Sequence, residues 1–415
     1  MKNDPDVLVA GGSIAGCITA LSFARNGLRV EIVEKARLPD NYKRLCTHFI
    51  QPSALPVLKE LELDRMIEEA GGLRNKADIW TSAGWIRSNR PYTEDPGTAY
   101  GYNIERRILD PLLRKVVAAH PLIHFRSGFE LHKIKWVDEN PDRVRGFIFL
   151  DNHKNQLELE AKLLVAADGR YSKMAALLLN KEEIQPNMRF ACFAYFENVP
   201  LHSGNHSQFW MIDSNMAFAY PLAHNRTLIC LFILNSEWPE WKNNLDHKYL
   251  SFIKNLTDAP PVDGGQRVSA IYKALDIPNI FRQPVYKGVA FIGDAAMALD
   301  PMSGVGCGFA IQTGSWLANI TAAAIKGNGA LNDALQQYAT YHSRQLLPHA
   351  TGICADSLAK PLNESRHALL QEVVNDAYLT DAFLALTGRI ITPGDFQSRY
   401  LKRMLQRKMN PENIN

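Results

Sequence analysis

Apolar and polar positions follow two different periods in the N-terminal part of the chain. Val7 to Ala10 is an aliphatic and β-branched run, which is typical of a buried parallel strand. Residues 17–24 form an apolar helical stretch that ends before Gly27, a residue suited to the left-handed position that closes a helix. Residues 28–33 alternate as a strand does and lead into Glu34. The pattern predicts a strand–helix–strand unit.

Later apolar runs extend this picture. Residues 163–167 and 289–292 are predicted as two further buried strands, and the small-residue stretch from Phe309 towards Ile325 as a helix. Short apolar runs that alternate with turns predict an antiparallel sheet between them, at residues 190–196, 208–212, 216–222 and 227–234. Residues 330–415 are predicted to be helical. The chain should therefore be an α/β protein with an antiparallel insertion.

The turn after the first strand carries candidate chemistry. Gly11 lets the chain turn sharply, and the small residues around it let backbone N–H groups approach a pyrophosphate at the helix N-terminus. Gly16 allows the helix to pack closely on the strand, and Glu34 ends the next strand where a carboxylate can accept ribose hydroxyls. Ser13 stands where the usual pattern has a glycine, but its hydroxyl can face the phosphate. A dinucleotide site is predicted here.

Composition excludes several classes of partner. The 415 residues include 46 Lys and Arg against 43 Asp and Glu, so neither nucleic acid nor an anionic membrane is expected as the main partner. The six cysteines form no Cys-x-x-Cys pair and none lies near a His at zinc-like spacing, so no metal site is predicted. No apolar signal core and no run of about 18 apolar residues is present, so we expect a cytoplasmic protein without a transmembrane segment.

Three separated motifs resemble the para-hydroxybenzoate hydroxylase-like flavoproteins, which include monooxygenases, halogenases and geranylgeranyl reductases. They are the glycine-rich turn, Asp168-Gly169 followed by Ser172, and Gly293-Asp294-Ala295-Ala296 followed by Pro301 and a Gly-x-Gly helix start. The resemblance implies FAD as the cofactor. The residues that it places at FAD are Gly11, Gly12, Ser13, Ala15, Gly16, Glu34, Lys35, Arg44, Arg107, Asp168, Gly169, Gly293, Asp294, Pro301, Gly304, Val305 and Gly306.

The resemblance also implies roles along the length of FAD. The glycine-rich turn would meet the pyrophosphate, Glu34 the adenosine ribose, and Asp294 the ribityl chain. The helix that starts at residues 304–306 would point its positive end at the N1–C2=O edge of the flavin ring, where the reduced flavin carries negative charge. Arg44 and Arg107 could pair with the phosphates, and Arg106 is an alternative to Arg107.

The implied architecture is a discontinuous, Rossmann-like FAD-binding domain of the glutathione reductase type. It would comprise residues 1–184 and 276–335, with residues 75–100 contributing to the substrate side. Residues 185–275 would form an antiparallel β substrate domain, and residues 336–415 a C-terminal helical region. Side chains of the inserted sheet are either substrate-pocket walls or ordinary sheet core; the candidates are Trp210, Phe218, Tyr220 and Pro221.

The resemblance implies, first, a monooxygenase that hydroxylates an aromatic or other electron-rich substrate through a flavin C4a-hydroperoxide, with NAD(P)H and O2 as co-substrates. Pro301 and His48 would border the reacting atoms, with His48 either a general base or a structural histidine. The substrate would be a small molecule, free or carried on a carrier protein or peptide, and a separate flavin reductase is an alternative electron source.

Departures from the hydroxylase pattern leave two other reactions open. Met297 and Gly308 stand where many hydroxylases have His and Asn. Cys46 lies in a segment that resembles one near the flavin of geranylgeranyl reductases, which suggests a double-bond reductase. Lys76 lies in a segment loosely similar to that of flavin-dependent halogenases, although their Trp-x-Trp-x-Ile-Pro stretch appears here as residues 217–221 without tryptophan.

Overall fold

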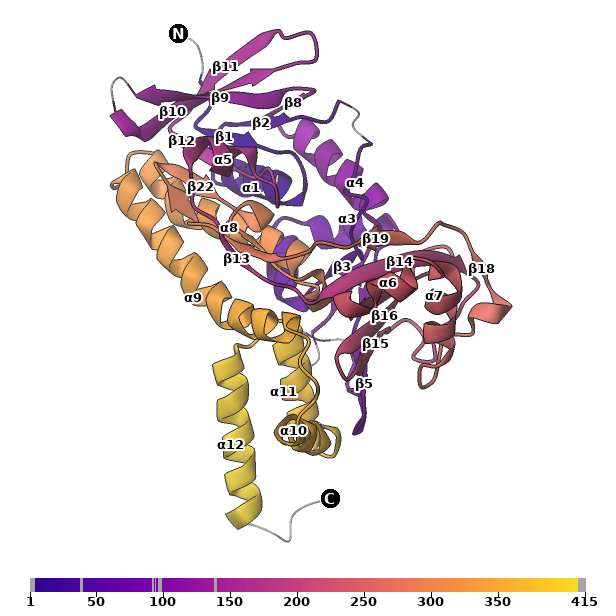
Figure 1. The fold of residues 1–415 in the computed structure, drawn as a ribbon. Helices are drawn as coiled ribbons and strands as arrows, with labels where there is room; N and C mark the ends of the chain where they lie inside the picture. Colours follow the sequence, from indigo (N-terminus) through magenta and orange to yellow (C-terminus); the bar gives the residue numbers. More distant parts are fainter. Residues whose placement is uncertain are drawn as a thin grey trace.

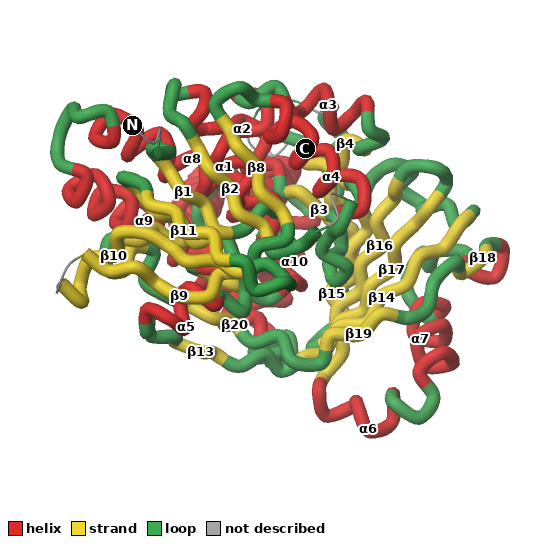
Figure 2. The backbone as a smooth tube through the Cα atoms, turned by 90° about the horizontal axis from the view of Figure 1, so that it is seen from above, coloured by secondary structure: helices red, strands yellow, loops and turns green. Residues whose placement is uncertain are grey.

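The computed structural model describes residues 4–409, apart from 38–39, 92, 94, 96–98 and 138–139. Two sheets lie side by side, and helices cover them (Figure 1, Figure 2). The first sheet has the strand order β21-β22-β12-β1-β2-β8. Its strands are β21 (Val285–Tyr286), β22 (Val289–Phe291), β12 (Leu163–Ala166), β1 (Val7–Ala10), β2 (Val30–Glu34) and β8 (Ile123–Ser127). All neighbours are parallel except β21 and β22.

The central strand β1 shows why its sequence is apolar throughout. Val7 and Val9 join the core beneath the helices on one face, and Leu8 and Ala10 join a second core on the other. A strand that is buried on both faces reads as a continuous apolar run instead of an alternating one. The helices on the first face are α1 (Ile14–Arg25), α2 (Leu55–Glu60), α3 (Leu63–Glu69), α4 (Arg106–Ala119), α8 (Gly306–Ile325) and α9 (Leu331–Ser357).

The other face of the parallel sheet is covered by a small antiparallel layer. Phe147, Phe149 and Met174 fill the core between the two. The layer consists of β9 (Glu130–Val137), β10 (Asn140–Leu150), β11 (Gln156–Glu160) and α5 (Lys173–Leu178). Further short strands are β3 (Phe49–Ile50), β4 (Leu73–Asn75), β7 (Gly101–Asn103), β13 (Glu183–Gln185), β20 (Asn279–Phe281) and β23 (Met297–Ala298).

The second sheet is antiparallel along most of its length. Phe190, Cys192 and Ala194 face one core, and the alternating residues Ala191 and Phe193 face another, as expected for a sheet buried on both sides. Its long strands are β14 (Arg189–Glu197), β15 (Ser207–Ile212), β16 (Asn215–Leu222) and β17 (Arg226–Leu234). The outer face is covered by α6 (Trp238–Trp241) and α7 (Leu245–Lys254), and short edge strands are β18 (Gln266–Arg267) and β19 (Tyr272–Ala274).

A segment from the first hundred residues completes the second sheet. Strand β5 (Ala77–Thr81) pairs in parallel with β15, with Ala77 opposite Ser207, and β6 (Gly84–Ile86) pairs with β5. Ile79 and Ile86 pack on the C-terminal helices, which project from the end of α9 (Figure 1). These helices are α10 (Glu364–Val374), α11 (Ala377–Thr387) and α12 (Pro393–Met409). Over the described ranges, every helix is too short or too polar to cross a bilayer.

The predicted fold class is confirmed at the level of a mixed α/β fold with parallel and antiparallel sheets and C-terminal helices. The predicted strands at 7–10, 163–167, 208–212 and 289–292 each form within one or two residues of their expected bounds. The layer β9–β11 was not predicted. Strands β9 and β11 mix charged and apolar positions and lack a clear apolar run. Residues 147–150 of β10 are an apolar run that the sequence analysis did not assign to a strand.

Candidate active site

A cavity of about 620 Å³ lies between the carboxyl ends of the parallel strands and the inner face of the second sheet. We call it the main cavity, and its volume is within the range of about 300–1,000 Å³ that is usual for ligand sites. Ligands of open parallel sheets bind at this end of the strands. The predicted cofactor residues that line it are Gly11, Ser13, Ala15, Glu34, Lys35, Asp168, Gly169, Asp294, Pro301, Gly304 and Gly306.

The glycines of the β1–α1 turn are required by close backbone contacts. Gly11 has φ +114°, and a Cβ on it would lie 2.4 Å from the carbonyl oxygen of Ala167. A Cβ on Gly16 would lie 1.8 Å from the carbonyl oxygen of Gly11. The Glu34 carboxylate accepts the N–H of Gly12 at 2.6 Å, so it ties the end of β2 to the turn. Gly12 and Gly16 therefore shape the main cavity from behind without lining it.

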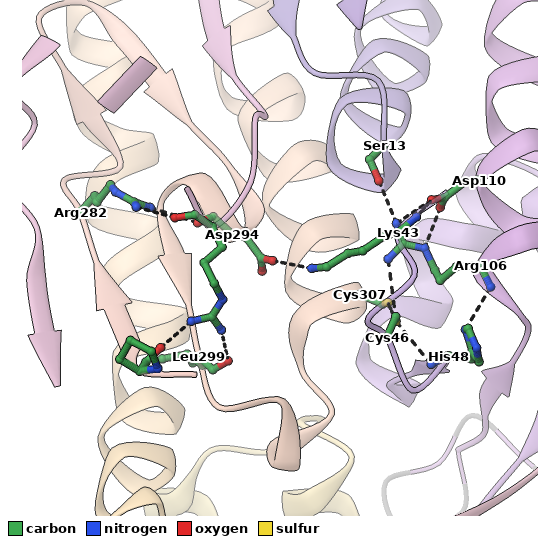
Figure 3. Close-up of polar contacts among 12 residues, drawn as sticks. Ser13, Lys43, Cys46, His48, Arg106, Asp110, Arg282, Asp294, Leu299 and Cys307 are labelled. Carbon is green, nitrogen blue, oxygen red and sulfur yellow. Dashed lines mark hydrogen bonds and ion pairs between the residues drawn. The ribbon is translucent and has the colours of Figure 1, made fainter. Parts of the chain in front are cut away.

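Arg106 brings positive charge to this turn (Figure 3). Its guanidinium is 4% exposed and donates two hydrogen bonds to Asp110, at 2.7 and 3.0 Å. It also donates to the Ser13 hydroxyl at 2.8 Å, and Arg114 donates to the Gly12 carbonyl at 2.9 Å. A buried arginine that is held in this way presents a fixed charge beside the backbone N–H groups of the turn, which suits a phosphate.

The opposite part of the main cavity centres on Asp294, which follows β22 (Figure 3). Lys43 Nζ lies 2.9 Å from Asp294 Oδ2. Burial opposes ionisation of the carboxyl, but the Lys43 ammonium outweighs it and lowers the pKa of Asp294. Arg282 holds the turn from below by donating to the carbonyl oxygens of Asp294 and Ala295, at 3.2 and 3.0 Å. Asp294 is thus a fixed carboxylate at the wall.

Helix α8 begins beside Asp294 and aims its N-terminus at the main cavity. Gly304 closes the preceding turn with φ +64°, and the helix starts at Gly306. The unpaired N–H groups of the first turn make this end partly positive. Val305 is buried behind the turn, and Gly293 donates its N–H to Thr313 at 3.0 Å, so both predicted residues support the site without lining it.

Two cysteines from distant segments meet in the main cavity. The Sγ atoms of Cys46 and Cys307 are 4.0 Å apart, and Cys46 also accepts the His48 N–H at 3.4 Å. The hydrogen bond from Cys307, helped by His48 and the Arg106 charge, holds the pKa of Cys46 well below its usual range despite burial. The same hydrogen bond and burial raise the pKa of Cys307. The hydrogen bond between the two sulfurs therefore favours negative charge on Cys46 and a proton on Cys307.

Asp168 anchors the loop after β12. Its carboxylate accepts the Ser172 hydroxyl at 2.6 Å and the Met174 N–H at 2.9 Å, while burial raises its pKa. The carboxylate therefore holds the loop at the start of α5, and Gly169 presents the backbone to the main cavity.

Arg44, Arg107 and His48 lie elsewhere, against expectation. They line a separate polar cavity of about 200 Å³. Arg107 pairs with Glu105 at 2.7 Å, whereas the alternative residue, Arg106, borders the main cavity. His48 accepts the Arg106 N–H at Nδ1, and its Nε2 meets the Tyr195 hydroxyl, so both ring nitrogens are engaged.

The residues of the second sheet that were candidates for the pocket wall belong instead to the hydrophobic cores of that sheet. Trp210 faces the outer core and donates to the Thr257 carbonyl, and Phe218 and Tyr220 are fully buried. The residues of the sheet that do line the main cavity are Ala191, Phe193, Cys230, Phe232 and Ala274. Trp210 lies on the outer face of the sheet, whereas Phe218 and Tyr220 face the same inner core as Phe193 and Phe232 and are covered by neighbouring aromatic rings. Alternation along a strand separates the two faces, but it does not separate cavity wall from core on one face.

Four residues of the site had no place in the sequence analysis: Lys43, Arg114, Arg282 and Cys307. One signal could have found Arg114, because Arg106, Asp110 and Arg114 recur every four residues and share one helix face. An arginine–aspartate–arginine row that is buried among apolar residues points to a binding role. Lys43 and Arg282 reach the site through contacts between distant segments, whereas Cys307 directly follows Gly306 of the predicted helix start.

The chain is similar to several known proteins. Digeranylgeranylglycerophospholipid reductase 1 of Methanococcoides burtonii is 24% identical over 353 residues, which cover 81% of this chain and 79% of the reductase. Squalene monooxygenase SE1 of Panax ginseng is 22% identical over 319 residues, 74% of this chain and 56% of that protein. The flavin-dependent brominase Bmp2 has the same fold, with a TM-score of 0.78 at 16% identity over 97% of this chain and 100% of the brominase.

A family described as FAD binding domain matches residues 4–350. This range includes the β1–α1 turn, Asp168, Asp294 and the start of α8, which are the parts of the main cavity that were predicted to bind the cofactor. The chain therefore belongs to the FAD binding domain family of FAD-dependent oxidoreductases, that of the para-hydroxybenzoate hydroxylase-like flavoproteins.

Proposed function

We propose that the protein is an FAD-dependent monooxygenase that adds oxygen to an aromatic or other electron-rich substrate, with NAD(P)H as the electron source. The observation that carries the proposal is the main cavity, which joins a nucleotide-binding turn to an aromatic-walled chamber. Phe49, Phe193 and Phe232 line this chamber, and Pro301 borders it. FAD, when bound, supplies the chemistry with dioxygen, so the chain must position two molecules and exclude water.

In this proposal the side chains and backbone of the main cavity hold FAD along its length. The β1–α1 turn receives the pyrophosphate through its N–H groups and Ser13, and Arg106 supplies positive charge. Glu34 accepts ribose hydroxyls, and Asp294 accepts a ribityl hydroxyl. The N-terminus of α8 at Gly306 stabilises negative charge on the reduced ring. These roles fit the close contacts at Gly11 and the fixed carboxylate at Asp294.

The proposal includes a discontinuous FAD-binding domain of the glutathione reductase type. Residues 1–184 and 276–335 form it, residues 185–275 form the substrate domain, and residues 336–415 form the helical region. Support comes from β22, which follows the whole antiparallel sheet in the chain and yet pairs with β12 in the parallel sheet.

A double-bond reductase is the second candidate, and the cysteine pair favours it. Cys46 and Cys307 both line the main cavity with their Sγ atoms 4.0 Å apart, and the Cys307 thiol, whose pKa is raised, could deliver a proton to a substrate carbon. The similarity to digeranylgeranylglycerophospholipid reductase 1 points the same way. The third candidate, a halogenase, needs a lysine at the flavin. Lys76 instead lines another cavity and donates to the Arg90 carbonyl.

The deciding experiment is an anaerobic titration of the purified protein with NADH and NADPH, followed by turnover of phenols and indoles under ¹⁸O₂. A monooxygenase bleaches the flavin absorbance on titration and then gives a product that contains one ¹⁸O atom. Product with unchanged oxygen content under anaerobic turnover would establish the reductase instead. If neither nucleotide bleaches the flavin, added flavin reductase distinguishes an enzyme that is fed by a partner from one that is inactive.

A pair of variants tests the cofactor site itself. Asp294→Ala removes the fixed carboxylate at the cavity wall, and we expect it to lower the flavin content of the purified protein at least tenfold. Asp263→Ala removes an exposed aspartate outside the site and should leave flavin content unchanged. A colourless wild-type protein that takes up no added FAD would contradict the proposal that this cavity binds FAD.

A further inference from the structure

A second cavity of about 400 Å³ adjoins the main cavity. The two share Phe49 as a wall residue and lie on either side of the turn at residues 301–304, with Pro301 and Gly304 facing one and Met302 and Ser303 the other. The second cavity is enclosed by the edge of the antiparallel sheet, α9 and the C-terminal helices. Its walls are mainly large apolar side chains, among them Phe209, Met211, Met216, Phe383 and Phe396.

Four basic side chains interrupt this apolar lining, and two of them are engaged: Lys76 donates to the Arg90 carbonyl, and Arg366 pairs with Asp356. The other two are Arg389 and His349. Arg389 follows α11, and its Nε is buried without an acceptor anywhere in the described part of the chain. His349, on α9, is 5% exposed, and its Nδ1 also has no partner among the described residues. Burial lowers the pKa of Arg389 to about 10 and that of His349 to about 4, so at neutral pH the arginine is charged and the histidine is neutral.

The carboxylates nearest to these two residues are engaged with other groups. Asp356 faces the second cavity but pairs with Arg366 at 3.0 Å. Asp395 accepts both the N–H and the hydroxyl of Thr392, at 2.9 and 2.7 Å. Arg389 therefore brings a positive charge into an apolar cavity with no carboxylate bonded to it among the residues described. A buried charge without a hydrogen-bonded partner is costly, and it marks a place where a ligand anion gains affinity.

We propose that the second cavity binds an amphiphilic carboxylic acid, with its carboxylate on Arg389 and its apolar body against the Phe209, Met211 and Met216 wall. The planar guanidinium matches a carboxylate with two parallel hydrogen bonds, and neutral His349 adds an N–H donor. Lys76 and Arg366 are already engaged with other groups of the protein, so Arg389 offers one further positive charge. One charge balances a monoanion and disfavours a phosphate dianion in a largely apolar space. The apolar end then points past Phe49 towards the main cavity. The further statement that this acid is the substrate to be oxygenated rests on the proposed function.

The test uses dodecanoate as the probe and dodecanol as its uncharged analogue, with binding to the flavin-loaded protein measured by calorimetry. We expect one dodecanoate per chain, and Arg389→Met should weaken its binding at least tenfold while changing dodecanol binding less than twofold. The exposed Lys402→Met, on the neighbouring helix α12, removes a charge without touching the cavity and should change neither affinity.

A second variant tests the apolar part of the cavity independently. Met211→Trp should fill the space beside Phe209 and weaken both probes. If Arg389→Met does not fold, the wild-type preference for dodecanoate over dodecanol and the loss of both with Met211→Trp still decide the matter. Equal binding of the two probes, or dodecanoate binding that survives in Arg389→Met, would overturn the proposal. Dodecanoate is saturated and serves only as a binding probe. Arg389-dependent binding of dodecanoate, together with no ¹⁸O in any phenol or indole product, would leave this site standing and contradict only the proposed function.

Discussion

At the scale of single residues, the β1–α1 turn depends on the absence of a side chain at Gly16. A Cβ there would lie 1.8 Å from the Gly11 carbonyl oxygen, a backbone atom that cannot move aside cheaply. We expect Gly16→Ala to lower the free energy of unfolding by about 1–3 kcal/mol and to reduce flavin content. Gly352→Ala, in the interior of α9 where a Cβ meets no atom within 4 Å, should instead stabilise by about 0.5–1 kcal/mol. Denaturant unfolding of both variants checks the contrast.

The thiolate character of Cys46 is a second property of one residue. Because the pKa of Cys46 is lowered, its thiolate should persist and react at pH values low enough to protonate an ordinary thiol. Iodoacetamide at pH 6 should therefore label Cys46 ahead of the five other cysteines, as read by peptide mass mapping. Cys307→Ala removes the main hydrogen bond to the thiolate and should slow this labelling. Equal labelling rates in the parent and the variant would contradict the assignment.

At the scale of elements, the C-terminal helices are joined through Asp376. This residue caps α11 by accepting the Leu379 N–H at 3.1 Å, and it pairs with Arg403 and Arg407 of α12, at 2.6 and 2.7 Å. Asp376→Ala should destabilise by about 3 kcal/mol, since it removes the cap and leaves two arginines without their shared partner. Asp376→Asn keeps the cap and should cost less. Lys402→Met, an exposed change on α12, should stay within about 0.5 kcal/mol.

The same carboxylate gives these helices a pH dependence. Burial would raise the pKa of Asp376, but Arg403, the Leu379 N–H and Arg407 together lower it in the folded state. A lowered folded-state pKa stabilises the fold above the unfolded pKa of about 4, and the stabilisation is lost as pH falls through the folded value. The difference in melting temperature between the parent and Asp376→Asn should thus be constant near neutral pH and shrink in strong acid. A difference that grows on acidification would contradict this sign.

Elements built from local signals were predictable, and those that depend on pairing between distant segments were not. Adjacent residues alone predict three of these elements. They are β1 and β16, from their apolar runs, and the β1–α1 turn, from its glycines. Strand β5 pairs with β15, with Ala77 opposite Ser207, and no local sequence pattern indicates this pairing. The candidate site divides in the same way. Asp294 follows a recognisable strand and Cys307 directly follows Gly306 of the predicted helix start, whereas Lys43 becomes a neighbour of the site only when separate segments close the main cavity.

At the scale of the whole molecule, the main cavity couples flavin binding to folding. Its walls come from segments throughout the first 310 residues, so the unfolded chain offers no assembled site. Bound FAD should raise the free energy of unfolding by about 2.7 kcal/mol at a free concentration 100 times its Kd. Thermal melting of flavin-stripped protein at increasing FAD concentrations measures the effect. A melting temperature that is independent of FAD would contradict assignment of this cavity to the cofactor.

The position of β22 has a consequence for how a ribosome delivers this chain. Its partner β12 leaves the exit tunnel long before it, and the long strands β14, β15, β16 and β17 of the antiparallel sheet are translated in the interval. Strand β5 is likewise translated well before its partner β15. Nascent chains therefore carry open strand edges for most of their synthesis, which is when such edges aggregate. The start of α8 is translated after all the parallel strands, so the nucleotide pocket can close only near the end of translation.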